Sequence, residues 1–557
     1  MCGPGVLHRS VLDHLSGLSG SLQQWPRTKP LPRIGFEPPR SSPGCRWRPT
    51  SAIGVPLEHG LYATLIALRL ARSLGLDQET TAQTYYGCLL FYVGCTATAE
   101  ASVGIFGSED ALTTYATPMR FGSRREMVSG MMRAVAPPDN PLLERAAMLA
   151  GSLPKLVRKF RGVVAVNCEV GRLFSEQLGL PASEATLFAY IGERWDGRGE
   201  PGQLKGEELP LPMRIIHVAR DAAFQLMLGG EKFAAQVIRQ RAGGAFDPHI
   251  AGMLADEAVE MLAFDAGSSA WETVLASEPN PMFLLEGEEI DAALSAIGDF
   301  TDLVSPYMVG HSRGVAALAA GAARRCGLGN SEQVAIRRAG LLHDVGRVAV
   351  PVRIWLKAGS LNHDDMERVR LHAYHSERVF ARSPSLAELT LIATAHHERL
   401  DGSGYHRGTP AAGLSKAARL LAAADVYHAM TEPRPYRPAL PADRAAETLK
   451  EEVRAGRLDT DAVAAVLDVS GQRVFNLERP VGLTEREAMV LGLLARGLQT
   501  KQMARSLGIS AKTADRHVQN IYRKIGVSTR AAATLFALQH GLVGWGELPI
   551  SHPAVRP

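Results

Sequence analysis

The stretch Leu341-Leu342-His343-Asp344-Val345-Gly346-Arg347 decides how this chain is interpreted, together with His396-His397-Glu398, which begins 53 residues after His343. Nine of the 17 histidines lie between His311 and His428, a span of 118 residues. Imidazole and carboxylate groups at this density are typical of a site for metal ions of intermediate softness. We therefore expect the chain to be organised around a metal centre.

The bulk composition narrows the class of protein. The 557 residues include 46% hydrophobic and 21% charged side chains, as in ordinary globular proteins that fold into several domains. The six cysteines form no C-x-x-C pair, which argues against a disulfide framework and against a Cys-based zinc site. No apolar run is long enough to span a membrane, and residues 1–50 lack the apolar core of a secretory signal. These features predict a cytoplasmic protein that has no membrane partner.

The sequence predicts an all-α chain in five parts. Residues 1–50 carry eight Pro and seven Lys or Arg against two acidic residues, which favours a disordered basic arm over a transit peptide. Apolar residues recur at helical spacing in two large blocks, separated by Ser277-Glu278-Pro279-Asn280-Pro281, and in a compact third block. The expected boundaries are 1–50 for the arm, 51–285 and 286–478 for two tandem helical domains, 479–545 for a four-helix domain, and 546–557 for a tail.

The two large blocks look like copies of one helical domain. A shift of 252 residues places Phe91-Tyr92-Val93-Gly94 on His343-Asp344-Val345-Gly346. A shift of 205 residues places Ile191-Gly192-Glu193 on His396-His397-Glu398. Framework residues match, but His343, Asp344, His372, His396, His397 and Asp425 are replaced by Phe91, Tyr92, Asn167, Ile191, Gly192 and Arg220, and of the would-be ligands His59 alone remains. We expect the first copy to be catalytically inactive and to pack against the second, with ligand binding or dimerisation as alternatives.

Seven residues of the second block form the candidate metal site: His311, His343, Asp344, His372, His396, His397 and Asp425. A carboxylate shared by two ions holds them about 3.5–4 Å apart, where they lower the pKa of a water and polarise a phosphoryl oxygen. A single buried histidine is more often a packed core residue, but that interpretation is weak for seven residues together. His363, His375 and His428 match no ligand position, so we expect them at the surface or in a supporting role.

Residues 295–440 resemble an HD-GYP domain, the phosphodiesterase branch of the HD phosphohydrolase superfamily. The motifs are Gly310-His311-Ser312, His343-Asp344-x-Gly346, His396-His397-Glu398-x-x-Asp401-Gly402-x-Gly404-Tyr405, Ala424-Asp425 and Arg434-Pro435-Tyr436-Arg437. The resemblance implies that the seven residues hold two divalent ions, iron or manganese, with Asp344 between them. It implies a phosphorylated nucleotide as substrate, specifically a cyclic dinucleotide such as cyclic di-GMP. The implied catalytic residues are His343, Asp344 and Arg347, and the implied substrate contacts are Arg347, Gly404, Tyr405, Arg434 and Arg437.

Three residues depart from the family pattern. His406 follows Gly404-Tyr405 where the motif has Pro, and Arg347 stands where Lys is usual. Tyr307 occupies the position at which some relatives carry a Glu that holds a third metal, so two ions are expected. For Arg347, contact with a phosphate and a structural ion pair both stay open.

Residues 483–540 predict a helix-turn-helix. Ser510 is a typical N-cap for a helix that starts at Ala511, and Gly508 ends the helix before it. Residues 480–545 contain nine Lys or Arg against three acidic residues, which favours a phosphate-bearing partner. The motifs Leu483-Thr484-x-Arg486-Glu487 and Ser510-x-Lys512-Thr513-Ala514-x-x-His517 resemble a LuxR-type DNA-binding domain. The resemblance assigns to the DNA-facing side Lys512, Thr513, Arg516, His517 and Asn520, with Lys524 on the DNA backbone.

Together these features predict a transcriptional regulator that hydrolyses a phosphorylated nucleotide and binds DNA as a homodimer. One alternative is a transcription factor that binds the nucleotide without turnover, so that the ligand shifts the DNA-binding equilibrium. Another is an HD hydrolase that acts on a different phosphate ester.

Overall fold

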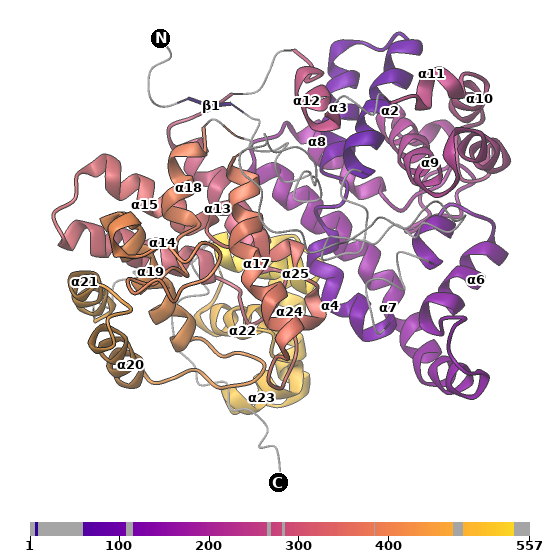
Figure 1. Cartoon of the computed structure of the whole chain (residues 1–557). Coiled ribbons are helices and arrows are strands. Elements are labelled where there is room, and N and C mark those ends of the chain that lie inside the picture. The colour runs from indigo at the N-terminus through magenta and orange to yellow at the C-terminus, as the bar shows by residue number, and fades with distance from the viewer. Residues whose placement is uncertain are drawn as a thin grey trace.

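The computed structural model of the protein describes residues 6–8, 59–106, 115–264, 269–280, 284–381, 383, 385–471 and 483–539. These residues are almost entirely helical, as the sequence predicts (Figure 1). Their one sheet consists of two short antiparallel strands, β1 (Val6–His8) and β2 (Leu284–Glu286). β1 lies in the predicted disordered arm, so for these three residues the structure differs from the expectation. The rest of the arm and the tail 546–557 lie outside the described residues.

The first helical half contains ten α-helices in the described ranges. α2 packs along α9, and a left-handed Gly75 (φ 64°) follows the end of α2. Asp77 caps α3 through the backbone N–H of Thr80, and Ser123 forms a capping box with Glu126 at α6. The helices are α2 (His59–Ser73), α3 (Gln78–Leu89), α4 (Cys95–Phe106), α6 (Arg124–Val135), α7 (Leu142–Gln177), α8 (Ala182–Leu187), α9 (Leu211–Arg241), α10 (Pro248–Asp256), α11 (Ala258–Leu262) and α12 (Ala270–Ala276).

The second half repeats this pattern over its described residues. Left-handed Gly327 (φ 72°) follows α14 as Gly75 follows α2, 252 residues earlier. Asn362 caps α17 and Ser415 caps α19. The helices are α13 (Glu288–Asp302), α14 (His311–Arg325), α15 (Asn330–Leu342), α16 (Val352–Trp355), α17 (His363–Phe380), α18 (Ala387–Ala393), α19 (Lys416–Thr431), α20 (Ala442–Arg454) and α21 (Thr460–Ser470). Short 3₁₀ segments lie at Thr117–Met119, Phe188–Tyr190, Gly206–Glu208, Val345–Ala349 and Ala411–Gly413.

Close backbone contacts recur at matched glycines of the two halves. A Cβ atom on Gly94 would lie 2.3 Å from the carbonyl oxygen of Asn167, and one on Gly346 would lie 2.0 Å from that of His372. No side chain fits in such a space, so glycine is required at both places. The shared contacts show that the two halves pack in the same way. The segment after α3 lies against α7 in the first half, and the segment after α15 lies against α17 in the second.

A second pair of glycines orders the loop that follows the His396-His397 position. A Cβ on Gly199 or on Gly404 would lie 2.5 Å from the Cα of Glu193 or Glu398, respectively. The Glu193 carboxylate accepts hydrogen bonds from two backbone N–H groups of its loop, and the Glu398 carboxylate does the same in the second half. The framework is therefore common to both halves, although the ligand positions differ.

The two halves share one hydrophobic core. A single cluster of buried residues includes side chains from both of them. At their junction α7 contacts α13, and the rings of Phe174 and Phe300 lie 5.2 Å apart. This continuous core fixes the second half, which carries the predicted metal ligands, against the first.

Four C-terminal helices form a separate core: α22 (Glu485–Ala495), α23 (Thr500–Leu507), α24 (Ala511–Ile525) and α25 (Arg530–Gln539). Figure 1 shows these helices in yellow beside both halves. α25 contacts α7, and Leu173 of α7 packs against the C-terminal core. Gly497 approaches the second half so closely that a Cβ atom there would lie 3.1 Å from Pro306. No helix among the described residues has both the length and the apolar character needed to cross a membrane.

Candidate metal centre

The carboxylate of Asp344 lies between two groups of histidines. Its Oδ2 is 2.9 Å from Nε2 of His343 and 3.3 Å from Nε2 of His311. Its Oδ1 is 3.2 Å from Nε2 of His372 and 3.6 Å from Nε2 of His396. One oxygen thus faces each pair of imidazoles, which is the geometry of a carboxylate that could bridge two cations.

Asp425 joins the same two groups from α19. Its Oδ1 lies 3.2 Å from Nε2 of His311, and its Oδ2 lies 3.8 Å from Nδ1 of His397. Ligand atoms of all seven predicted residues fall within groups in which every atom lies within 4.8 Å of the others. The structure therefore brings together His311, His343, Asp344, His372, His396, His397 and Asp425.

Backbone carbonyls orient three of the imidazoles. Nδ1 of His343 lies 2.8 Å from the carbonyl oxygen of Gly340, and Nδ1 of His396 lies 2.6 Å from that of Ala393. His372 makes the same contact with the carbonyl of Val369. Because a carbonyl oxygen only accepts, each Nδ1 carries the proton, and Nε2 presents its lone pair to the centre. This tautomer is the one that binds a metal ion.

Buried polar atoms without partners test whether metal ions fit this site. Nε2 of His311, Nε2 of His343 and Oδ1 of Asp344 are buried and make no hydrogen bond, whereas Oδ2 of Asp344 forms an ion pair with Arg347. Such atoms are costly to bury unless they are paired or coordinate a metal. They converge on one another, and their nitrogen and oxygen donors suit first-row divalent ions. The donor set therefore fits two ions that share Asp344.

The protonation states at the centre are set by burial and by neighbouring charges. Burial, followed by the charge of His343, lowers the pKa of His396 to about 3, so this imidazole is neutral. Burial also disfavours charge on His343, but Asp344 and Asp425 outweigh it and raise the pKa of His343 to about 9. Without a metal ion, His343 therefore holds a second proton on Nε2. A metal ion bound at Nε2 would displace this proton, as metal binding to histidine usually does.

Two residues outside the predicted ligand set support His311. The Glu432 carboxylate lies 2.9 Å from Nδ1 of His311 and 3.1 Å from Nδ1 of His428. A carboxylate behind a ligating histidine fixes its ring and tautomer. The sequence analysis did not include Glu432, although the His428-x-x-x-Glu432 spacing was a usable signal. His428 is 4% exposed and takes the supporting role, not a surface position.

Arg347 lies at the wall of the centre. Its Nη2 is 2.5 Å from Oδ2 of Asp344, and its guanidinium lies over the Trp355 ring at 5.6 Å. Nε of Arg347 is buried without a hydrogen-bond partner. The ion pair favours the structural reading of Arg347, and the unpartnered Nε leaves one donor for a further acceptor.

The loop after His397 has an unusual conformation at His406. The Tyr405 ring stacks on His397 with 4.4 Å between centroids. His406 has φ 85°, a left-handed conformation that proline cannot adopt, and its ring pairs with Glu377. The departure from the family motif at His406 therefore accompanies a different backbone path. His363, by contrast, is exposed, and His375 lies outside the centre.

Arg434 and Arg437, the predicted phosphate contacts, have protein partners in this structure. Arg434 pairs with Glu432 at 2.9 Å and donates to the carbonyl oxygen of Tyr307 at 2.6 Å. Arg437 donates to the carbonyl oxygens of four residues, Ala429, Met430, Glu432 and Pro438. Both guanidinium groups would have to exchange partners in order to bind a phosphate.

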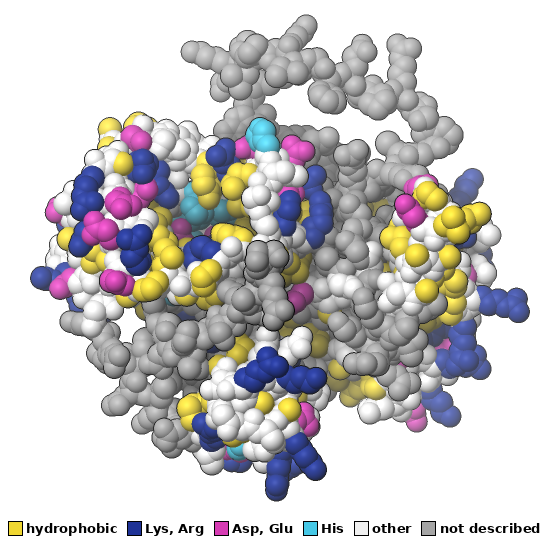
Figure 2. Space-filling model, turned by 90° about the horizontal axis from the view of Figure 1, so that it is seen from below, with side chains coloured by type: hydrophobic (Ala, Val, Ile, Leu, Met, Phe, Trp, Pro, Cys, Tyr) yellow, Lys and Arg dark blue, Asp and Glu magenta, His cyan; other side chains and the backbone are white. Residues whose placement is uncertain are grey.

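Access to the centre is narrow. Of the seven residues, His397 has the most exposed side chain, at 16%, and the other six are 3% exposed or less. Figure 2 shows histidine side chains, in cyan, recessed in a hollow between hydrophobic and basic side chains. A substrate would therefore reach the centre on the side of His397 and Tyr405.

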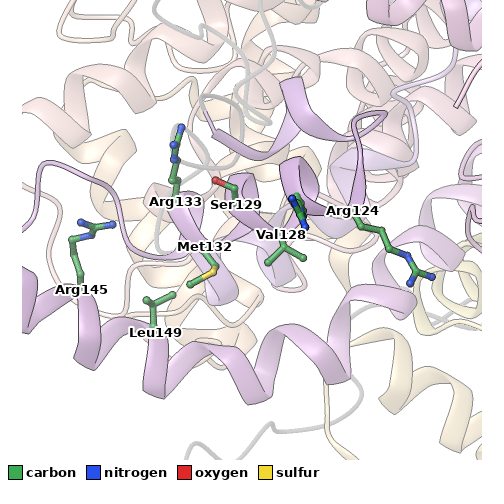
Figure 3. Close-up of a pocket in the computed structure, with 8 residues that line it drawn as sticks. Arg124, Val128, Ser129, Met132, Arg133, Arg145 and Leu149 are labelled. Carbon is green, nitrogen blue, oxygen red and sulfur yellow. The ribbon is translucent and has the colours of Figure 1, made fainter. Parts of the chain in front are cut away.

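A separate groove of about 540 Å³ lies between α6 and α7 (Figure 3). In that view Val128, Met132 and Leu149 lie along its apolar floor. Arg124, Arg125, Arg133 and Arg145 also line it. This groove belongs to the first half and contains none of the seven predicted ligands.

All six predicted DNA-facing residues lie on α24. Ser510 caps this helix through the backbone N–H of Thr513, at 3.0 Å. Lys512, Thr513 and Arg516 are exposed, whereas His517 and Asn520 are half-buried. Lys524 pairs with Glu487 at 2.6 Å, so its ammonium group already has an acceptor.

Comparison with known proteins agrees with both parts of this architecture. The family model "HD domain" matches residues 174–250 and 297–462, and the model "Bacterial regulatory proteins, luxR family" matches residues 481–537. The protein 3'3'-cGAMP-specific phosphodiesterase 3 of Vibrio cholerae is 28% identical over 417 residues, which are 74% of this chain and 90% of that protein.

Other relatives match shorter segments. A cyclic di-GMP phosphodiesterase of Thermotoga maritima is 33% identical over 29% of this chain and 43% of its own length. A cyclic di-GMP phosphodiesterase response regulator of Xanthomonas campestris pv. campestris is 37% identical over 22% of this chain and 33% of its own length.

A solved structure shares the fold. The crystal structure of a cyclic GMP-AMP-specific phosphodiesterase of Vibrio cholerae matches with a TM-score of 0.53 and 21% identity, over 85% of this chain and 99% of that one. The chain therefore contains an HD domain, similar to that of HD-GYP-type cyclic-dinucleotide phosphodiesterases, and a C-terminal domain of the luxR family of bacterial regulatory proteins.

Proposed function

We propose that this protein is a two-metal phosphodiesterase that opens a cyclic dinucleotide and, in the cytoplasm, binds DNA as a homodimer. The observation that carries the proposal is the Asp344 carboxylate, with one oxygen toward His311 and His343 and the other toward His372 and His396. The relatives named above as phosphodiesterases of 3'3'-cGAMP or cyclic di-GMP support this substrate class.

The donor set divides into two groups that would each hold one divalent ion, iron or manganese. His311, His343 and Asp425 make up one group, and His372, His396 and His397 make up the other, with Asp344 common to both. When bound, such a pair of ions lowers the pKa of a water and stabilises charge on a phosphoryl oxygen. In the net reaction water adds to phosphorus, one P–O ester bond breaks, and a proton goes to the leaving oxygen.

The residues around the two groups would hold the substrate. Tyr405 presents a ring at the open side of the centre, where a nucleobase could stack. Arg347 would turn its free Nε toward a phosphate oxygen while Nη2 stays on Asp344. The close approach of Gly404 to Glu398 keeps the loop backbone near the centre. Arg434 and Arg437 would join only if the substrate displaced their present acceptors.

The C-terminal domain would place α24 in the major groove. Its exposed Lys512, Thr513 and Arg516 supply donors to phosphates and base edges, and His517 and Asn520 lie farther along the same helix. The half-sites of a near-palindromic operator would then set the spacing of two copies.

Turnover of cyclic di-GMP and of 3'3'-cGAMP by the metal-loaded full chain tests the proposed activity. We expect a linear dinucleotide product, and we expect Asp344→Ala to abolish product formation and metal binding together. Asp401→Ala is the matched control, because Asp401 is exposed and, among the described residues, its carboxylate accepts hydrogen bonds only from Ser403 of its own loop.

The outcomes separate the competing functions. Two metal equivalents without turnover of either dinucleotide, but with a nucleotide-dependent change in DNA affinity, would replace the enzyme with a sensor. Two metal equivalents with turnover of another phosphate ester would keep the mechanism and change the substrate. Absence of metal after reconstitution would overturn the catalytic proposal.

A further inference from the structure

The first half contains a vacated site, defined as His59, Phe91, Tyr92, Asn167 and Arg220, which occupy positions matching metal ligands of the second half. These residues cluster in space. Nε2 of His59 lies 2.8 Å from the carbonyl oxygen of Arg220, and its ring centroid lies 5.4 Å from that of Tyr92. The Arg220 guanidinium lies 3.2 Å from the centroid of Phe91 and 4.3 Å from that of Tyr92. The sequence repeat is thus also a spatial repeat.

The vacated site carries a positive charge at a position where the metal centre of the second half carries a negative one. Where the second half has Asp425, the first has Arg220, which is 4% exposed. Nε and Nη1 of Arg220 are buried and have no hydrogen-bond partner. Stacking on two aromatic rings stabilises such a cation by less than the desolvation of its charge costs.

A second guanidinium lies nearby. Arg120 lies over the Phe121 ring at 5.9 Å, and the His217 ring lies 5.3 Å from that of Phe121 and 6.5 Å from that of Phe91, on which Arg220 stacks. Burial, followed by the positive charge of Arg220, lowers the pKa of Arg120. The backbone N–H of Arg120 donates to the carbonyl oxygen of Thr117, but its guanidinium makes no hydrogen bond or ion pair with any described residue. The neighbouring carboxylate of Asp221 is already engaged by Arg241 at 2.5 Å and by Gln225 at 3.2 Å. No acidic side chain therefore neutralises Arg220 or Arg120 directly among the described residues.

We propose that the vacated site binds the oxyanion of a small phosphate-bearing ligand, with the guanidinium groups of Arg220 and Arg120 as its anchors. Guanidinium is the side chain best matched to phosphate, because its N–H donors form a planar fork. The amide of Asn167, whose oxygen accepts a hydrogen bond from the hydroxyl of Thr98 at 3.1 Å, adds a polar group to the vacated site. Duplication has thus converted a cation site into an anion site.

This inference does not depend on catalysis in the second half, and it holds whether or not that half turns over a substrate.

Hydrogen exchange of the metal-loaded full chain tests the proposal and also locates the site. Inorganic phosphate would be compared with chloride at equal ionic strength, and cyclic di-GMP would be a second probe. We expect slower exchange in peptides covering residues 88–96 and 213–225, by about tenfold when the probe is at ten times its Kd. Protection by phosphate alone would identify a simple oxyanion site, and protection by cyclic di-GMP alone would identify a nucleotide site.

Two variants and a control make the result specific. Arg220→Met and Arg120→Gln should each abolish the protection, whereas Arg172→Gln, which removes an exposed i,i+4 pair with Glu176 on α7, should leave it unchanged. If Arg220→Met fails to fold, Arg120→Gln still tests whether the site binds an oxyanion, because Arg120 is only half-buried. Arg220 would be only a filler of the old metal site if neither probe protected these peptides, or if Arg120→Gln were protected like the wild type.

Discussion

The carboxylate of Glu169 accepts hydrogen bonds from the backbone N–H and the hydroxyl group of Thr529, at 2.9 and 2.5 Å. The same carboxylate accepts from the backbone N–H of Ser528 at 2.7 Å and from the Ser528 hydroxyl group. Glu169 lies on α7 of the first half, and Thr529 directly precedes α25. A carboxylate at a helix N-terminus satisfies free N–H groups and complements the helix dipole. The DNA-binding domain is thus anchored to the first half, while Lys512 and Arg516 on α24 stay exposed.

Glu169→Gln should loosen this anchor. The amide loses the negative charge and can serve fewer of the four donors, and a hydrogen bond to a charged group is worth about 1.5–3 kcal/mol. We expect exchange of residues 528–535 to become at least about tenfold faster in the full chain. Glu176→Gln, on the same helix, is the control and should leave this peptide unchanged. Equal exchange in Glu169→Gln and the wild type would mean that packing contacts, such as that of Leu173, hold the domain without Glu169.

Glu432→Gln should weaken metal binding without removing a ligand. The charged carboxylate fixes His311 through Nδ1, and loss of such an outer partner typically lowers metal affinity by about 10–100-fold. Metal titration of the full chain, followed by analysis of bound ions, measures this change. His363→Gln serves as the control, because the His363 side chain is 84% exposed. Unchanged affinity in Glu432→Gln would leave Glu432 as a structural partner of His428 and Arg434.

His406→Pro would restore the family motif but should damage this protein. Proline fixes φ near −65°, whereas His406 has φ 85°. We expect a loss of about 2 kcal/mol or more in local stability and reduced order around Tyr405, measured by hydrogen exchange of the loop. His406→Gly keeps the backbone conformation accessible and separates strain from loss of the contact with Glu377. A fully ordered loop in His406→Pro would show that the loop follows another path.

The candidate ligand set could be proposed from sequence because its members sit in short motifs, and because the first copy matches the framework around them at shifts of 252 and 205 residues. The roles of the surrounding residues could not. Glu432 is 121 residues from His311, and only the fold brings them to 2.9 Å. The motif suggested phosphate contacts for Arg437, but its donors meet backbone carbonyls, and carbonyl positions are not encoded by any one residue. Arg220 shows what could and what could not be predicted from the sequence. Its replacement of Asp425 could be read from the repeat, whereas its stacking on Phe91 could not.

The buried imidazole of His217 should make the first half sensitive to mild acid. His217 lies among aromatic rings, with 5.3 Å between its centroid and that of Phe121. Burial, followed by the charges of Arg220 and Arg120, lowers the pKa of His217 from 6.5 to about 3. Below pH 6.5 the unfolded chain binds a proton that the folded chain does not, so stability is complete above pH 6.5 and falls as the pH decreases toward 3. Each pH unit in this window costs about 1.4 kcal/mol.

His217→Leu should remove this contribution to the pH dependence. The measurement is hydrogen exchange of the 213–225 peptide between pH 7 and pH 5, corrected for the intrinsic exchange rate. As the pH is lowered, the free energy of local opening should fall in the wild type and should fall less in the variant. We expect the two slopes to differ by about 1.4 kcal/mol per pH unit. His363→Gln again serves as the control, because the imidazole of His363 is exposed to water in the folded chain as it is in the unfolded chain. The same slope in His217→Leu and the wild type would mean that His217 keeps an ordinary pKa in the folded protein.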